Sequence, residues 1–224
     1  MLQLQPMRQV KPYFSVPIKE NGERLVILNE KEFVLPPGDK EKIVVREKVA
    51  KLLHGASKKL PVGYKFNIYD AWRSKKAQKG MIVRFKKKIK NENPTWDKKK
   101  IDIEILKYAA PVVSDPNKPP PHNTGGALDL TIVDKSGNSL PMGGEAGELS
   151  EKSTFDFYKG SETLLDREFH ANRLLLGKAL NSVGFAPNDN EWWHFDYGNQ
   201  RWAHYYKQPF AYYGGLKAPG EKAF

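Results

Sequence analysis

The stretch EWWH, residues 191 to 194, places an acid and an imidazole three positions apart with two tryptophans between them. Tryptophans commonly fill a core, whereas the acid and the histidine need partners from elsewhere in the chain. A second histidine, His122, opens the segment HNTGGALD and precedes Asp129 by seven positions. Two imidazoles and one carboxylate are a common ligand set for catalytic zinc, and they leave one position for water. His122, Asp129 and His194 are therefore candidate metal ligands.

The spacing of His122 and Asp129 sets a condition on the backbone. In a regular strand, an odd separation directs two side chains to opposite faces of the sheet. Gly125 and Gly126 lie between them and permit a bend or a bulge. We expect the chain to turn at these glycines, so that both side chains face one point.

Two further residues could act beside a metal ion. Glu191 lies three residues before His194, so it could exchange a proton with an activated water without binding the ion itself. Arg73 follows a predicted strand in YDAWRSKKAQ, and loops at strand ends often carry functional groups. The alternative for Arg73 is a purely structural ion pair with Asp70.

Length and composition limit the class of protein. With 224 residues and 39% hydrophobic content, the chain suits one domain. We predict a single domain over 1–224, with an extended N-terminal segment at 1–40 and a C-terminal tail at 206–224. The absence of cysteine excludes disulfides and thiolate metal sites. No run approaches the roughly 18 apolar residues of a membrane span. The opening MLQLQPMRQVKPYF lacks the apolar core of a signal peptide, so we expect a cytoplasmic protein without a membrane partner.

The positive charge requires a separate explanation. The formal net charge is +11, and the excess lies largely in RFKKKIKNENPTWDKKK, residues 84 to 100. Lysines of this kind usually form the solvated face of an amphipathic helix. The alternative is a non-enzymatic protein that binds nucleic acid or another anionic polymer, but it leaves the His, Asp and Glu set unexplained. We therefore predict no nucleic-acid partner.

Periodicity predicts the elements that must position these groups. A helix is expected at 41–59, with Val45, Val49, Leu52, Leu53 and Ala56 on one face. Residues 141–160 are rich in glycine and acids, typical of a loop or a lid, and Gly143 to Gly147 could close over a pocket. The remaining expected elements are strands at 63–72, 127–134 and 191–197, a turn at 134–138, a lysine-rich helix after residue 72, helices at 97–108 and 162–183, and a continuation of the sheet at 201–206. Without a βαβ rhythm, this order predicts an α+β fold with a central, mostly antiparallel sheet flanked by helices.

Four segments, in order, resemble the D-alanyl-D-alanine dipeptidase family: YDAWRSKKAQ, HNTGGALDLT, PMGGEAGELSEKSTFDFY and NRLLLGKALNSVGFAPNDNEWWHFDYG. The resemblance covers roughly residues 40 to 205. Members are zinc enzymes and include the dipeptidases of vancomycin resistance and housekeeping relatives. The resemblance implies one zinc ion per chain and a small D,D-dipeptide as substrate. It also implies roles for six residues: His122, Asp129 and His194 as ligands, Glu191 as catalytic base, Arg73 in transition-state stabilisation, and Asp156 near the amino end of the substrate.

Some positions depart from the family pattern. Pro120 stands where the family has a serine, and Trp72 stands where it has a tyrosine. The loop between Met142 and Asp156 is longer than in typical members. These differences concern the exact dipeptide preference. A related metallopeptidase, acting as a D,D-carboxypeptidase or endolysin-type endopeptidase on longer peptidoglycan peptides, remains the alternative. Antibiotic resistance, cell-wall recycling and nutrient use are all compatible with the sequence, which indicates no oligomeric state.

Overall fold

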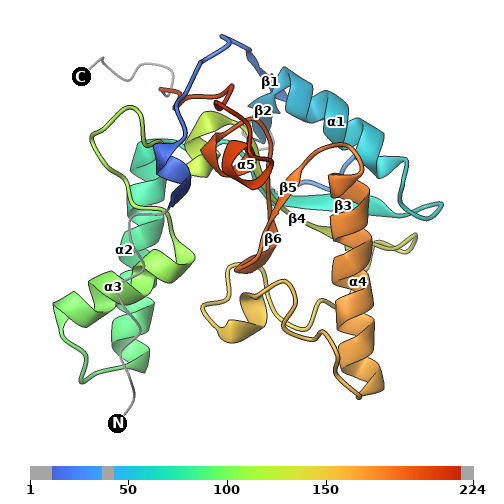
Figure 1. Cartoon of the computed structure of the whole chain (residues 1–224). Coiled ribbons are helices and arrows are strands. Elements are labelled where there is room, and N and C mark those ends of the chain that lie inside the picture. The colour runs from blue at the N-terminus through green and yellow to red at the C-terminus, as the bar shows by residue number, and fades with distance from the viewer. Residues whose placement is uncertain (1–11, 37–42, 218–224) are drawn as a thin grey trace.

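A computed structural model describes residues 12–36 and 43–217 of the protein. Helices and strands alternate irregularly along the chain, and Figure 1 shows their arrangement. The elements are η1 (Pro12–Ser15), β1 (Leu25–Ile27), β2 (Val44–Arg46), α1 (Glu47–Ser57), β3 (Lys65–Asp70), α2 (Lys75–Glu92), α3 (Lys98–Tyr108), η3 (Pro121–Thr124), β4 (Ala127–Val133), η4 (Glu151–Ser153), α4 (Leu164–Asn181), β5 (Ala186–Asn188), β6 (Glu191–Asp196) and α5 (Gln200–Tyr205).

The central sheet is antiparallel throughout and has the strand order β3-β4-β6-β5. A separate pair, β1 and β2, is also antiparallel. Helices α1 and α4 lie on one side of the central sheet, and the pair α2 and α3 stands apart on the other side (Figure 1). The predicted α+β class with an antiparallel sheet is confirmed. The assignment of the whole chain to one domain stays a prediction.

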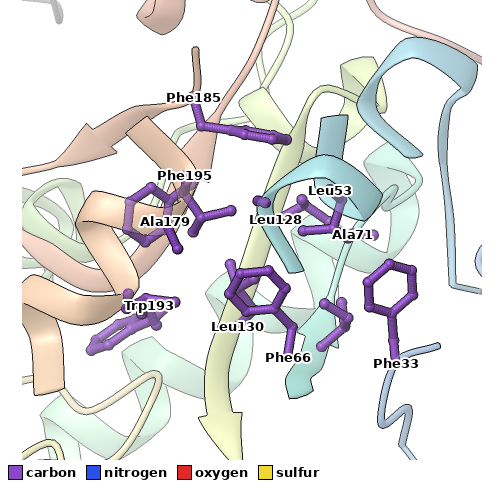
Figure 2. Packing of buried hydrophobic residues seen from close by; sticks show 14 of the residues in the cluster. Phe33, Leu53, Phe66, Ala71, Leu128, Leu130, Ala179, Phe185, Trp193 and Phe195 are labelled. Carbon is purple, nitrogen blue, oxygen red and sulfur yellow. The ribbon is translucent and has the colours of Figure 1, made fainter. Parts of the chain in front are cut away.

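The main hydrophobic core lies between the central sheet and helices α1 and α4. Alternate residues of β4, Leu128 and Leu130, are fully buried in it. They pack with Phe66 of β3, Leu53 of α1 and Phe195 of β6 (Figure 2). Since successive side chains of a strand point to opposite faces, this burial directs Asp129 to the other face of β4. The same alternation that builds the core therefore presents a carboxylate on the far side of the sheet.

Two predicted elements are wrong in type or extent. The helix expected at 41–59 begins only at Glu47, because Val44, Val45 and Arg46 form strand β2 and pair with β1. Residues 41 and 42 lie outside the described part. The segment 201–206 does not continue the sheet but belongs to helix α5, whose N-cap Asn199 accepts a hydrogen bond from the backbone of Trp202. A local cap thus decides the structure of a segment whose aromatic content favours a strand.

The other elements agree with the sequence prediction in type. Helix α4 ends just before Gly184, whose φ of +95° is the left-handed conformation typical of a helix C-terminus. Helices α2 and α3 begin at the capping residues Ser74 and Asp97 and share a small apolar core of their own. In the described part of the chain, no helix is long and apolar enough to cross a membrane.

Candidate metal centre and active site

Three side chains converge on one point beside the two central strands, β4 and β6. The Nε2 atom of His122 lies 3.2 Å from Nδ1 of His194 and 3.3 Å from Oδ2 of Asp129. The Nδ1 atom of His194 lies 2.9 Å from Oδ1 of Asp129. In a tetrahedral zinc site with bonds of about 2.0–2.1 Å, two ligand atoms are roughly 3.4 Å apart. The observed separations match the spacing of ligands around one ion, and the cluster can hold a metal.

The sheet itself positions two members of the cluster. Asp129 of β4 pairs directly with His194 of β6, and residues opposite each other in an antiparallel pair point to the same face. On the other side of β4, Asp70 of β3 pairs with Asp129 after a register shift in β3. Asp70, Asp129 and His194 therefore form a row across three adjacent strands. The row lies on the face opposite the core residues Leu128 and Phe195.

His122 comes from outside the sheet, as the glycine pair predicted. It lies in the turn η3, and Gly125 then adopts φ +73° before β4 begins. Gly126 passes so close to the backbone of Tyr197 that a Cβ atom would lie 2.2 Å from its carbonyl oxygen. The Nδ1 atom of His122 lies 2.7 Å from the carbonyl oxygen of Ala71, so Nδ1 donates and Nε2 faces the cluster.

His194 has a corresponding partner on its outer side. Its Nε2 atom lies 3.1 Å from Oδ2 of Asp196, and that carboxylate accepts hydrogen bonds from Arg201 and Asn199. An outer carboxylate of this kind orients a ligating histidine and increases its basicity. Asp196 was not among the predicted site residues, although its position two residues after His194 in a strand places both side chains on one face.

Electrostatics favour a charged pair in the metal-free cluster. Burial lowers the pKa of His194, but the carboxylates of Asp196 and Asp129 outweigh it and raise that pKa to about 10. Burial would raise the pKa of Asp129, yet His122 and His194 hold it well below its usual range. For Asp196, burial is likewise outweighed by His194 and Arg201, and its pKa falls to about 2. Both carboxylates are thus ionised at neutral pH, and Asp129 is the one that belongs to the possible metal-binding group.

Glu191 lies beside the cluster but does not belong to its inner set. Its Oε2 atom is 3.9 Å from Nδ1 of His194 and accepts a hydrogen bond of 2.6 Å from Nδ2 of Asn188. In a regular strand, a separation of three would place Glu191 and His194 on opposite faces. The register of β5 and β6 shifts between Pro187 and Asn188, where Asn188 pairs with Glu191. This irregularity lets the acid turn towards the histidine.

Arg73 forms the expected ion pair with Asp70 and also lies near the ligand cluster. Its Nη2 atom forms an ion pair of 2.7 Å with Asp70 and lies 3.9 Å from Oδ2 of Asp129. Its backbone N–H donates to the carbonyl of His122, which couples the end of β3 to η3. Its Nε atom is buried and has no hydrogen-bond partner within residues 12–36 and 43–217. A buried donor of this kind in a cavity wall can be satisfied by an oxygen atom of a bound molecule.

These groups line one cavity of about 380 Å³, within the range of small-molecule sites. His122, Asp129, His194, Glu191 and Arg73 all contribute to its wall. Helices α2 and α3 and the loop residues 145–147 form other parts of the wall.

The structure does not bring Asp156 to this cavity. Its carboxylate is half exposed, forms an ion pair of 3.2 Å with Lys159, and is not among the described side chains of the wall. Asp156 follows η4, and its local partner is in the same turn. Its expected contact with a substrate amino group therefore has no support in the geometry.

The comparisons with known proteins agree with this geometry. A sequence model described as D-Ala-D-Ala dipeptidase, of peptidase family M15, matches residues 33–213. The chain belongs to this family of metallopeptidases. A D-alanyl-D-alanine dipeptidase of Synechocystis sp. is 31% identical, over 93% of this chain and 98% of the relative. A D-alanyl-D-alanine dipeptidase of Escherichia coli K12 is 37% identical, over 34% of this chain and 36% of the relative. The matched region of the dipeptidase family contains the whole cluster as well as Glu191 and Arg73.

Proposed function

We propose that this protein is a zinc-dependent dipeptidase that hydrolyses D-alanyl-D-alanine or a close D,D-dipeptide. The observation that carries the proposal is the convergence of His122, Asp129 and His194 at separations of 2.9 to 3.3 Å in a cavity wall. These three side chains would hold one zinc ion per chain. When bound, zinc lowers the pKa of water to about 7 and polarises a carbonyl oxygen. A cytoplasmic location also stays a prediction.

Glu191 is the proposed general base and acid. It lies 3.9 Å from a ligand nitrogen, too far to share the inner set but close enough to reach a molecule bound there. Its carboxylate would accept the proton of the attacking water and pass it to the departing amine. The hydrogen bond from Asn188 to Oε2 orients this carboxylate beside the cluster.

Arg73 is the proposed stabiliser of negative charge on the peptide carbonyl oxygen. The ion pair with Asp70 fixes the guanidinium, while its Nε remains a donor without a protein partner in the described structure. A fixed donor of this kind needs no rearrangement as charge develops, and such donors typically contribute about 10²–10³ in turnover.

A purified-protein assay tests this proposal. D-Ala-D-Ala, L-Ala-L-Ala and a pentapeptide that ends in D-Ala-D-Ala are each incubated with the protein, with and without a chelator. We expect cleavage of D-Ala-D-Ala alone, loss of activity with the chelator, and recovery on addition of zinc. Efficient cleavage of the pentapeptide would instead support a carboxypeptidase that acts on longer peptidoglycan peptides. Full activity after removal of all divalent ions would overturn the metal-dependent mechanism.

A further inference from the structure

The turn that carries His122 is supported from outside the central sheet. His122 lies in η3, which ends at Thr124, and Gly125 connects η3 to β4. Within the turn, the hydroxyl of Thr124 donates to the carbonyl oxygen of Pro121 at 2.6 Å. The carbonyl oxygens of Thr124 and Gly125 both accept hydrogen bonds from one residue, Arg46, at the end of strand β2.

Arg46 joins the turn through its side chain and its backbone. The side chain is buried, with only 1% of its surface exposed. Its Nε donates to the carbonyl of Thr124 at 2.8 Å, and its backbone N–H donates to the carbonyl of Gly125 at 3.0 Å. A guanidinium presents its donors in a rigid, planar fork. The last two carbonyl groups before β4 are therefore fixed relative to β2.

The other nitrogens of Arg46 bind two segments that lie far apart in the sequence. Nη1 and Nη2 form a bidentate ion pair with Glu20, at 2.9 Å each. Nη1 also donates to the carbonyl of Glu23, and Nη2 donates to the carbonyl of Gly214 at 3.4 Å. All three partners lie outside residues 33–213, the part that the family model matches. Segments on both sides of the matched part therefore meet at Arg46.

Asn123, the residue after His122, is bound to the same C-terminal segment. Its Nδ2 donates to the carbonyl of Leu216 at 2.9 Å and to the carbonyl of Arg73 at 3.1 Å. The backbone N–H of Leu216 in turn donates to the carbonyl of Asn123 at 2.9 Å. The turn is thus fixed by Arg46 through its last two carbonyl groups and by Leu216 through Asn123.

We infer that Arg46 is a positioning residue of the metal site, which fixes the turn that carries His122 and connects it to the segments on either side of the matched part. The inference rests on the proposed function and deepens it. A site works well only when its groups are held within about 0.5 Å of the productive geometry. Strand register aligns Asp129 with His194, but His122 comes from outside the sheet. The contacts of Arg46 supply the constraint that register does not.

The first experiment measures zinc affinity by competition with a chromophoric chelator. Arg46→Lys keeps the positive charge but lacks the Nε donor to Thr124, so zinc affinity should fall by roughly 10-fold. The matched control is Arg173→Lys, which changes another fully buried arginine. The guanidinium of Arg173 donates to the carbonyls of Met142, Lys152 and Thr154. The control should lower the melting temperature but leave zinc affinity at the wild-type value.

The second experiment follows amide hydrogen exchange in the metal-free protein. The backbone N–H groups of Arg73 and Gly125 both donate to the carbonyl of His122, so their exchange reports local opening of the turn. The amide of Leu130, in the buried strand β4, serves as the reference. In Arg46→Lys, exchange at the two reporters should accelerate by roughly 10-fold relative to Leu130, because a hydrogen bond from a charged donor is lost. Arg173→Lys should leave this ratio unchanged.

A third variant keeps the inference testable if Arg46→Lys does not fold. Glu20→Gln retains the arginine and its bond to Thr124 but loses the ion pair, and Glu20 is partly exposed. Its zinc affinity should fall by roughly 2- to 5-fold, as expected for a partly exposed pair. A wild-type affinity in Glu20→Gln would overturn the connection to the N-terminal segment.

The remaining results separate this inference from the function on which it rests. Equal zinc affinities of Arg46→Lys and the wild type would overturn the role of Arg46 and leave the proposed function intact. An equal loss of affinity in Arg46→Lys and Arg173→Lys would also overturn it, because general destabilisation would then explain both. A wild type that binds no zinc would refute the proposed function and, with it, any role of Arg46 in metal binding.

Discussion

Asp129 lies directly opposite His194 in the antiparallel pairing of β4 and β6, and their side chains meet at 2.9 Å. Their neighbours Leu128 and Phe195 are also paired, but on the core face of the sheet. The register that buries the core therefore also brings two candidate ligands together. A slip of one residue would reverse both faces, so stability of the sheet and formation of the site are coupled.

Replacement of Glu191 by glutamine should stop catalysis without removing the metal. The amide cannot accept the proton of water, so we expect kcat for D-Ala-D-Ala to fall by about 10²–10⁴-fold. Steady-state kinetics and zinc content, measured on the same preparation, check this. A variant that keeps wild-type kcat would remove Glu191 from the mechanism, whereas a variant without zinc would make it part of the metal site.

Asp196→Asn tests the outer partner of His194. The neutral amide no longer holds the imidazole through a charged hydrogen bond, so zinc affinity should fall by roughly 10- to 100-fold. Competition with a chromophoric chelator measures the change. Asp189→Asn, which neutralises an exposed acid before β6, is expected to bind zinc like the wild type. Equal affinities of the two variants would contradict a role for Asp196 in metal binding.

Much of the site could be predicted because its residues lie within short, distinctive segments. The alternation in 127–133 indicated strand β4, and the glycine pair indicated the turn that precedes it. The partners of the ligands were harder to find. Ala71 contributes a backbone carbonyl, which no residue type reveals, and Asn188 reaches Glu191 through a register shift that periodicity does not encode.

The errors in the predicted elements have local causes. A helical pattern over 41–59 included Val45, but pairing with β1 keeps it in a strand. Asp156 and Glu145 lie in one acidic, glycine-rich loop, and sequence alone does not show which side chain faces the cavity. Arg173, 31 positions from Met142 in sequence, fixes that loop through backbone carbonyls, a long-range contact without a sequence signal.

Arg173→Met should destabilise the fold and release the loop 143–153. Three carbonyl oxygens lose their buried donor, and each unsatisfied group costs about 1–3 kcal/mol, so the free energy of unfolding should fall by roughly 3 kcal/mol or more. Urea denaturation measures it, and limited proteolysis should show faster cleavage within the loop. Arg167→Met on the exposed part of the same helix should cost less than about 1 kcal/mol. An equal fall in the free energy of unfolding in the two variants would contradict the role of Arg173 as the anchor of the loop.

The metal-free protein should lose stability as the pH rises above neutrality. The folded pKa of His194 is raised to about 10 from an ordinary value of 6.5. The pairing of its imidazolium with Asp196 and Asp129 is thus fully present below pH 6.5 and is lost as the pH rises through about 10. Thermal melts in a chelator between pH 6.5 and 10 should show a falling melting temperature, with a weaker dependence in Asp196→Asn. A flat or rising profile in the wild type would contradict the charged pair.

The central claim, one metal ion held by three side chains, is tested most directly by anomalous diffraction at the zinc edge from crystals of the zinc-loaded protein. The expected result is a single strong peak about 2.0–2.2 Å from Nε2 of His122, Nδ1 of His194 and a carboxylate oxygen of Asp129. A peak bound to other residues, or no peak in a preparation that is fully active, would contradict it.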